Sequence, residues 1–293
     1  MTHAWPAEWL VPDWPAPAGV RAVFTTRSGG VSAAPYDAFN LGLHVGDATD
    51  AVARNRQVLR QSIGHAPVFM NQVHGTALLQ LAGAEPDEGE DEGEDEGEAM
   101  APVADAAWTQ VAGQVCTVMV ADCLPVLLCS ADGSWVAAAH AGWRGLAGSR
   151  GFGILEASLS AFKAFNAFEP MDSAGAAPEF IAWLGPCIGP QAFEVGPEVR
   201  AAFLSNLPDD NLAGPALDWH HAALEACFVP QAQGKYLAHL PQLARLRLAA
   251  LGVHRVYGND GSTPWCTVAN PLSFFSYRRD GVSGRMAACI WRD

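Results

Sequence analysis

The sequence lacks any apolar run long enough to cross a membrane. Half of its 293 residues are hydrophobic, yet no uninterrupted apolar stretch approaches the roughly 20 residues that a bilayer-spanning helix needs. The first residues, MTHAWPAEWLVPDWPAPAG, have neither the basic segment nor the apolar segment of a secretory signal peptide. We therefore expect a cytoplasmic protein with no membrane partner.

Closely spaced cysteine pairs are also missing. The chain has seven cysteines, an odd number, and none of them forms a CxxC pair. Secreted disulfide scaffolds and zinc knuckles both depend on such regular spacing. We therefore expect reduced thiols, which agrees with a cytoplasmic protein.

Basic side chains are few. Lysine and arginine total 17 against 31 acidic residues, and the formal net charge is −14. Ten of those acidic residues lie in 85–98, EPDEGEDEGEDEGE, so the rest of the chain carries 21 acidic and 17 basic side chains, a net charge of −4. Self-repulsion and glycine predict a disordered, solvated insert at 85–98, with calcium binding as an alternative. No basic patch offsets this charge, which argues against a nucleic-acid partner.

The common catalytic motifs are absent. The sequence contains no GxGxxG, no GxxxxGK[ST], no HExxH and no GxSxG. These absences argue against a dinucleotide-binding fold, a P-loop nucleotidase, a zinc protease of the HExxH type and an α/β-hydrolase.

What is present is an alternation of apolar runs with amphipathic segments. The run VCTVMVADCLPVLLCS (115–130) begins as almost continuously apolar, which is typical of a strand covered on both faces. We predict an α/β fold: a single-domain layered sandwich over 1–293, with a mixed β-sheet flanked by helices and the acidic insert at 85–98. The expected strands are 21–26, 66–75, 115–130, 134–142, 180–190 and 254–258; the helices are 146–165 and 236–252; a hairpin spans 274–291 and turns at 280–284.

Three side chains of the metal-ligating type stand at the ends of apolar runs. His74 follows VFMNQV, Cys123 follows VCTVMVAD, and His140 follows WVAAA. Any one of them is more often a satisfied core residue than a ligand, but strand ends gather at the edge of a sheet where sites form. Two imidazoles and a thiolate bind Zn²⁺ or a copper ion and leave one position open. Asp122 stands beside Cys123 and is a candidate for orienting a ligand.

Arginines near these positions suggest an anion site. Arg144 follows His140 where a strand gives way to a helix, and the free N–H groups of a helix start attract anions. Its guanidinium is a forked donor suited to phosphate. Arg278 and Arg279, in FSYRRDG, are a second cationic pair. Surface salt bridges remain the alternative for all three.

These motifs resemble the signature blocks of the polyphenol oxidase/laccase-domain family, also described as purine nucleoside enzymes and peptidoglycan editing factors. The blocks appear in the family's order and span nearly the whole chain. They are TTRSGGVS (25–32), FNLGLHVGD (39–47), NQVHG (71–75), ADCLPVLL (121–128), HAGWRGLA (140–147), LGPCIGP (184–190) with FEVG (193–196), and FFSYRRDGVSGRMA (274–287).

The resemblance implies a three-layer α/β fold in which His74, Cys123 and His140 hold a metal, zinc or else copper. It also implies phosphorolysis of adenosine, inosine and methylthioadenosine, with some adenosine deamination. We expect Cys123, His140 and Arg144 to be catalytic, and Asn40, Arg144 and Arg278 to contact the nucleoside and phosphate. The chain departs from the family pattern at the acidic insert and at SRGF (149–152), extra residues where a helix was expected to continue.

Three other functions stay open. Multicopper oxidases build several copper sites on paired HxH motifs, whereas this chain has nine histidines, no HxH and a single adjacent pair, His220–His221. One copper at the His/Cys/His group would still permit weak polyphenol oxidation. Cys123 with His140 would also suit a thiolate hydrolase that edits peptidoglycan precursors. A binding protein without any turnover is the third alternative.

Overall fold

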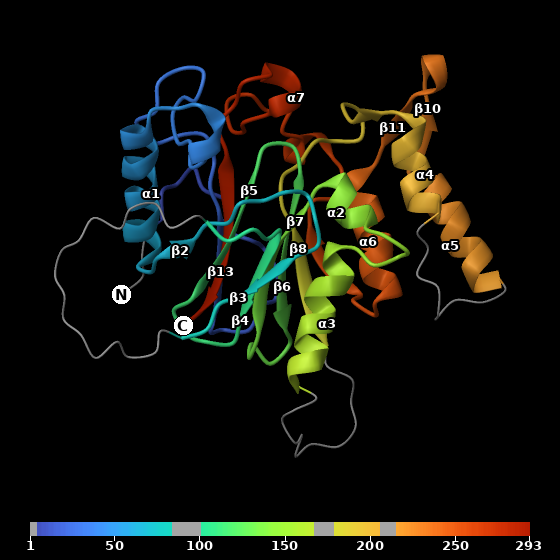
Figure 1. The fold of residues 1–293 in the computed structure, drawn as a ribbon, viewed down its shortest axis with the longest axis horizontal. Helices are drawn as coiled ribbons and strands as arrows, with labels where there is room; N and C mark the ends of the chain where they lie inside the picture. The colour runs from blue at the N-terminus through green and yellow to red at the C-terminus, as the bar shows by residue number, and fades with distance from the viewer. Residues whose placement is uncertain (1–4, 84–100, 167–178, 206–214) are drawn as a thin grey trace.

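The computed structural model describes residues 5–83, 101–166, 179–205 and 215–293 (Figure 1). Within these residues, the strands form three sheets. The first has the order β1 (Val20–Phe24), β13 (Met286–Arg292), β5 (Val115–Val120), β2 (Pro67–Val68). The second has the order β12 (Arg255–Gly258), β8 (Phe180–Leu184), β6 (Leu124–Ser130), β7 (Val136–Ala141), β4 (Ala106–Thr109), β3 (Leu78–Gln80). The third has the order β10 (Phe228–Pro230), β11 (Tyr236–Ala238), β9 (Glu194–Val195).

The helices cover both outer faces of the two larger sheets. In Figure 1, α1 lies beside the four-stranded sheet, while α2, α3 and α6 lie on the opposite side, with α4 and α5 beyond them. No helix among the described residues is long and apolar enough to cross a membrane. The helix bounds are α1 (Thr49–Ile63), α2 (Trp143–Ala147), α3 (Ile154–Asn166), α4 (Pro197–Ser205), α5 (Pro215–Glu225), α6 (Leu240–Ala250) and α7 (Tyr277–Asp280), with 3₁₀ turns at Leu43–Val45, Ala232–Gly234 and Thr263–Trp265.

The two larger sheets pack face to face, and this explains the continuous apolar runs of the sequence. Along β6, Leu127 and Cys129 belong to the core between the sheets, whereas Val126 and Leu128 face the core beneath the helices. Because successive residues of a strand point to opposite faces, a strand buried on both sides is apolar throughout. Every residue of β5, β6 and β7 is buried.

The predicted α/β class with mixed sheets is confirmed, but the number of layers is not. The sequence suggested one mixed sheet in three layers, whereas the strands form two stacked sheets between helices, which makes four layers. Each large sheet mixes parallel and antiparallel pairs, as the β2–β5 and β13–β5 pairs illustrate. The acidic insert predicted at 85–98 lies outside the described residues.

Two element predictions are wrong. The expected hairpin at 274–291 is a short helix, α7, followed by β13, which pairs with the distant strands β1 and β5. Ser276 starts α7 as its N-cap, because its side chain accepts a hydrogen bond from the backbone of Arg279. The expected helix at 146–165 breaks at Gly148, whose φ of 63° ends α2 before α3 begins.

Four further elements are divided or shorter than expected. The predicted strand at 115–130 is two strands, β5 and β6, which belong to different sheets, and the predicted strand at 180–190 ends at Leu184. The predicted strand at 66–75 is reduced to β2, followed by an isolated bridge between Asn71 and Val103. The predicted helix at 236–252 begins only at Leu240, because the three residues of β11 pair with β9 and β10 instead.

Candidate metal centre

His74 lies in a loop that is shaped by one buried carboxylate. Asp105, fully buried just before β4, accepts hydrogen bonds from the backbone N–H groups of Val73, His74 and Gly75, at 3.2, 2.8 and 2.7 Å. His74 has a φ of 63°, which non-glycine residues rarely adopt. Three consecutive amides around a single carboxylate hold the loop in this conformation.

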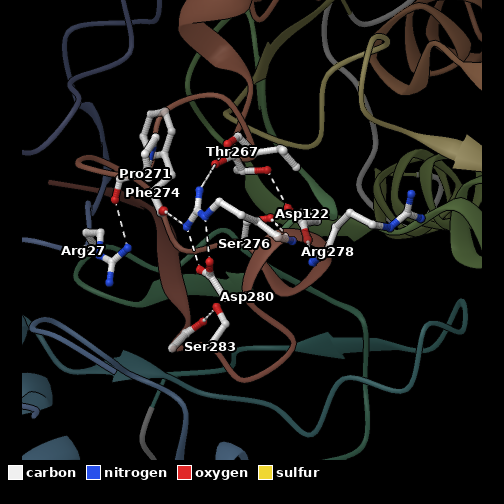
Figure 2. Close-up of polar contacts among 12 residues, drawn as sticks. Arg27, Asp122, Thr267, Pro271, Phe274, Ser276, Arg278, Asp280 and Ser283 are labelled. Carbon is white, nitrogen blue, oxygen red and sulfur yellow. Dashed lines mark hydrogen bonds and ion pairs between the residues drawn. The ribbon is translucent and has the colours of Figure 1, made fainter. Parts of the chain in front are cut away.

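Cys123 lies in the tight connection between β5 and β6, where the chain passes from one sheet to the other. The preceding residue, Asp122, has a φ of 90°. Its carboxylate accepts hydrogen bonds from the Thr267 hydroxyl and the Arg278 backbone, both at 2.6 Å (Figure 2). Asp122 therefore ties α7 and the loop of Thr267 to the turn that carries the Cys123 thiol.

His140 is buried inside β7, opposite Pro125 of β6. Its Nδ1 lies 2.9 Å from the Asp105 carboxylate. The same carboxylate therefore holds His140 through its ring and His74 through its backbone. A carboxylate on one imidazole nitrogen fixes the ring and leaves the other nitrogen for a ligand.

The structure brings His74, Cys123 and His140 together. Their ligand atoms all lie within 4.8 Å of one another, and Cys123 Sγ is 3.6 Å from His74 Nε2. This is the only group of three or more His, Cys, Asp or Glu side chains with such spacing in the described part of the chain. Two imidazoles and a thiolate suit zinc or copper, and three protein ligands leave a fourth position open.

The glycines of HAGWRG fit this group. A Cβ on Gly142 would lie 2.8 Å from His74 Cδ2 and 3.1 Å from Cys123 Sγ. A Cβ on Gly145 would lie 2.8 Å from the backbone oxygen of Gly75. The motif thus lets the start of α2 approach the ligands and the loop that carries His74.

Cys123 and His140 set each other's charge. Burial alone would raise the pKa of Cys123, but the charge of His140 and hydrogen bonds from both histidines lower the pKa of its thiol. Burial alone would lower the pKa of His140, but the Cys123 thiolate and the Asp105 carboxylate raise it. A thiolate is the form of cysteine that binds metals and attacks electrophiles.

A cavity of about 330 Å³ opens onto these side chains. This volume lies at the lower end of the range of small-molecule sites, roughly 300–1,000 Å³. Its walls combine apolar and aromatic side chains with a few polar ones. The apolar set includes Met119, Trp143, Ile188, Phe193 and Leu240, and the polar set includes His44, Gln72, Arg278 and Arg285.

The predicted substrate residues are not all at this cavity. Arg278 lines it, and Trp143 lines it in place of the neighbouring Arg144. Arg144 is exposed, with its guanidinium 4.4 Å from the centre of the Trp143 ring. Its helix, α2, has only five residues, which weakens the expected anion site at the helix start.

Asn40 is fully buried and makes its hydrogen bonds within the protein. Its Oδ1 accepts from the backbone of Gly42 and of Arg285, at 2.9 and 2.8 Å, and its Nδ2 donates to the Asp47 carboxylate. Asn40 is not among the residues that line the cavity, but it holds the backbone of Arg285, which lines it.

Sequence reasoning missed Asp105, His44 and Arg285. Arg285 stands inside the block FFSYRRDGVSGRMA, so that block carried a signal for it. Asp105 bonds to residues 30 to 35 positions away, and nothing local distinguishes it from other acids.

Comparison with known proteins extends over nearly the whole chain. Residues 21–293 match a family described as multi-copper polyphenol oxidoreductase laccase. An Escherichia coli protein named purine nucleoside phosphorylase YfiH is 45% identical over 284 residues, covering 96% of this chain and 98% of the relative. A Pseudomonas aeruginosa protein that is also named a purine nucleoside phosphorylase is 43% identical over 285 residues, covering 97% and 98%.

Solved structures show the same fold. A Neisseria meningitidis protein of 42% identity superposes with a TM-score of 0.77 and covers 98% of this chain and 99% of its own. YlmD from Geobacillus stearothermophilus, at 30% identity, gives a TM-score of 0.76 and covers 97% and 96%.

Proposed function

Because the chain belongs to the multi-copper polyphenol oxidoreductase laccase family, and curated relatives bear the name purine nucleoside phosphorylase, we propose that it cleaves purine nucleosides with phosphate. The proposed substrates are adenosine, inosine and methylthioadenosine, with adenosine deamination as a side activity. The observation that carries the proposal is one cavity that joins a His/Cys/His group, apolar walls and arginines.

The proposed reaction needs two kinds of surface, and the cavity offers both. A purine is flat and largely apolar, which suits walls such as Phe193, Ile188 and Trp143. Phosphate is an anion, which suits the guanidinium groups of the cavity. An oxygen of phosphate bonds to C1′ of the ribose while the bond from C1′ to the purine breaks, and the purine leaves with that electron pair. Such a displacement depends mainly on positioning and charge stabilisation.

A metal would be held by His74, Cys123 and His140, with Asp105 behind the two histidines. When bound, zinc would act as a Lewis acid and lower the pKa of a water at its open position to about 7. Deamination consumes a water and phosphorolysis does not, so the two proposed activities place different demands on the ion. The native metal is proposed to be zinc, with copper as the alternative.

The test is phosphate-dependent release of free base from a panel of purine nucleosides, with metal content measured on the same sample. The proposal expects base and ribose 1-phosphate in equal amounts, and no base without phosphate. Base release that is independent of phosphate would point to a hydrolase, and no release would contradict the proposal.

One observation favours a second function. Cys123, His140 and Asp105 form a thiol–imidazole–carboxylate series like that of cysteine hydrolases. The corresponding proposal is an amide hydrolase that edits peptidoglycan precursors. A bound metal would block the thiolate, so this function requires the metal-free protein to be active and sensitive to iodoacetamide.

The oxidase in the family's name has weaker support. Multicopper chemistry needs several linked copper sites, whereas the described residues contain a single three-ligand group. One copper there would permit slow oxidation of polyphenols, which an oxygen-uptake assay on the copper-loaded protein would detect.

A further inference from the structure

Arg285 is a half-buried cation without a carboxylate partner. It lines the same cavity as the His/Cys/His group, at the point where the chain enters β13. None of the ion pairs among the described residues includes it, whereas the buried Arg247 pairs with Glu156 and Arg279 pairs with Asp280. Charges removed from water are normally paired. The Cys123 thiolate and the Asp122 carboxylate act on Arg285 across the cavity, but neither forms an ion pair or hydrogen bond with its guanidinium, which leaves it free to pair with an anion that enters the cavity.

The Arg285 side chain is held in place before any ligand arrives. Its Nη1 donates to the backbone oxygens of Ser283 and Gly284, at 2.8 and 3.1 Å, and its backbone N–H donates to Asn40. A Cβ on Gly42 would lie 2.8 Å from Arg285 Cγ, so the stem of the side chain packs against a backbone without side chain. A donor fixed in this way loses little conformational entropy on binding.

Two more nitrogen-containing side chains lie beside Arg285: Arg56 adds positive charge, and His44 adds a hydrogen-bond donor. His44 lines the cavity, and Arg56 lies nearby with its guanidinium 3.8 Å from the centre of the Phe69 ring. Arg56 donates to the Leu41 backbone and takes part in no ion pair of the described chain. Partial burial, together with the charges of Arg285 and Arg56, lowers the pKa of His44. A neutral imidazole still offers one N–H donor to an anion.

The carboxylate of this cavity already has hydrogen-bond partners. Asp122 lines the cavity, but its two carboxylate oxygens accept from Thr267 and from the backbone of Arg278 (Figure 2). The Arg278 guanidinium in turn donates to the backbone oxygens of Ala192 and Glu194. Arg278 is therefore engaged in holding the β9 loop.

From this arrangement we infer that Arg285 and His44 form the subsite for inorganic phosphate, next to the His/Cys/His group. The inference locates the phosphate of the proposed phosphorolysis and rests on that function. It moves the subsite away from Arg144, which is exposed and stacked on Trp143. The planar fork of Arg285 matches two phosphate oxygens, and His44 supplies a further donor.

The test measures binding of inorganic phosphate to the metal-loaded protein by calorimetry, without any nucleoside. Arg285→Gln is expected to weaken phosphate binding about ten- to a hundredfold, and Arg285→Lys to recover part of it. Arg60→Gln is the matched control, because it removes the same charge from an exposed position of α1 and should leave binding unchanged. Metal content and melting temperature, measured on each variant, show that the folded site persists.

Several outcomes would overturn the inference. The first is that the wild-type protein does not bind phosphate. The second is a larger loss of phosphate affinity in Arg144→Ala than in Arg285→Gln. The third is that the site binds a nucleoside monophosphate and not inorganic phosphate. Base release is assayed separately on the same samples. Phosphate binding lost in Arg285→Gln without base release by the wild type would support the subsite and contradict the proposed phosphorolysis. Phosphate-dependent base release that Arg285→Gln leaves unchanged would support the proposed phosphorolysis and contradict the subsite.

Discussion

At the scale of single residues, Gly142 decides how closely the backbone approaches the metal ligands. A Cβ at this position would lie 2.8 Å from His74 Cδ2 and 3.1 Å from Cys123 Sγ, both closer than ordinary contacts. Gly142→Ala should therefore push the ligands apart by more than the about 0.2 Å that metal–ligand bonds tolerate. We expect a clear loss of metal affinity in a competition assay with a chromophoric chelator.

Gly83→Ala is the matched control for this substitution. A Cβ on Gly83 would meet Val111 at 3.6 Å, an ordinary contact, and would have no ligand atom within 4 Å. Metal affinity should stay at the wild-type value in this variant. Unchanged affinity in Gly142→Ala as well would refute the close approach.

Asp105 couples two of the three ligands. Its carboxylate accepts three backbone hydrogen bonds in the loop of His74 and contacts Nδ1 of His140. Asp105→Asn leaves one acceptor oxygen where there were two, so we expect about ten- to a hundredfold weaker metal binding. The free energy of unfolding should also fall, by about 1–3 kcal/mol, because buried donors lose their acceptor. Chelator competition and urea denaturation measure the two effects.

Asp132→Asn provides the comparison for Asp105→Asn. Asp132 also accepts three hydrogen bonds, from Ser130 and Ser134, but at the turn between β6 and β7. This variant should lose stability and keep its metal affinity. Equal loss of affinity in both variants would show that the effect is general and does not pass through the ligands.

At the scale of elements, the β6–β7 turn should make stability depend on pH. Burial would raise the pKa of Asp132, but hydrogen bonds from Ser130 and Ser134 lower it below its usual value. A carboxyl with a depressed pKa stabilises the fold above its unfolded pKa of about 3.9, and this contribution disappears as pH falls through the folded pKa. Solvent exposure keeps the contribution below about 1 kcal/mol.

Urea denaturation at pH 7, 5 and 3.5 tests this turn. The difference in free energy of unfolding between wild type and Asp132→Asn should be constant from pH 7 to 5. It should shrink at pH 3.5, below the unfolded pKa of about 3.9, because the carboxyl of the unfolded wild type takes up a proton there. A difference that is independent of pH would contradict the assigned hydrogen bonds.

Elements buried on both faces could be predicted from the sequence, and elements defined by distant partners could not. The apolar runs of β5, β6, β7 and β8 are a direct consequence of the cores on either side of them. The segment at 274–291 carried turn residues typical of a hairpin, yet β13 pairs with strands about 170 and 270 residues away. Turn chemistry reports local conformation and says nothing of such partners.

At the site, too, some features could be predicted from the sequence and others depend on distant partners. Three ligand-type side chains at the ends of apolar runs were visible in the sequence, and the fold brings them within 4.8 Å. Asp105 and Arg285 acquire their roles only through contacts with Asn40, His140 and the His74 loop, which are distant in the chain. Arg144 was proposed from its place at a helix start, but α2 ends after five residues, and the Arg144 side chain is exposed and does not line the cavity.

At the scale of the whole molecule, we expect the acidic insert to be dispensable. Ten acidic side chains within 85–98 repel one another, and their removal would change the net charge from −14 to −4. Shortening a connection costs little in loop entropy. Deletion of these residues should leave the melting temperature and base release within error of wild type. A marked fall in either one would show that the segment packs or acts.

The claim on which the rest depends is that His74, Cys123 and His140 hold one ion that the proposed phosphorolysis requires. The most direct measurement is titration of metal-free protein with Zn²⁺, following phosphate-dependent base release at each addition. The account predicts that activity rises linearly and reaches its plateau at about one equivalent, and that Cys123→Ser shows no such rise. Full activity in protein stripped of metal would contradict it.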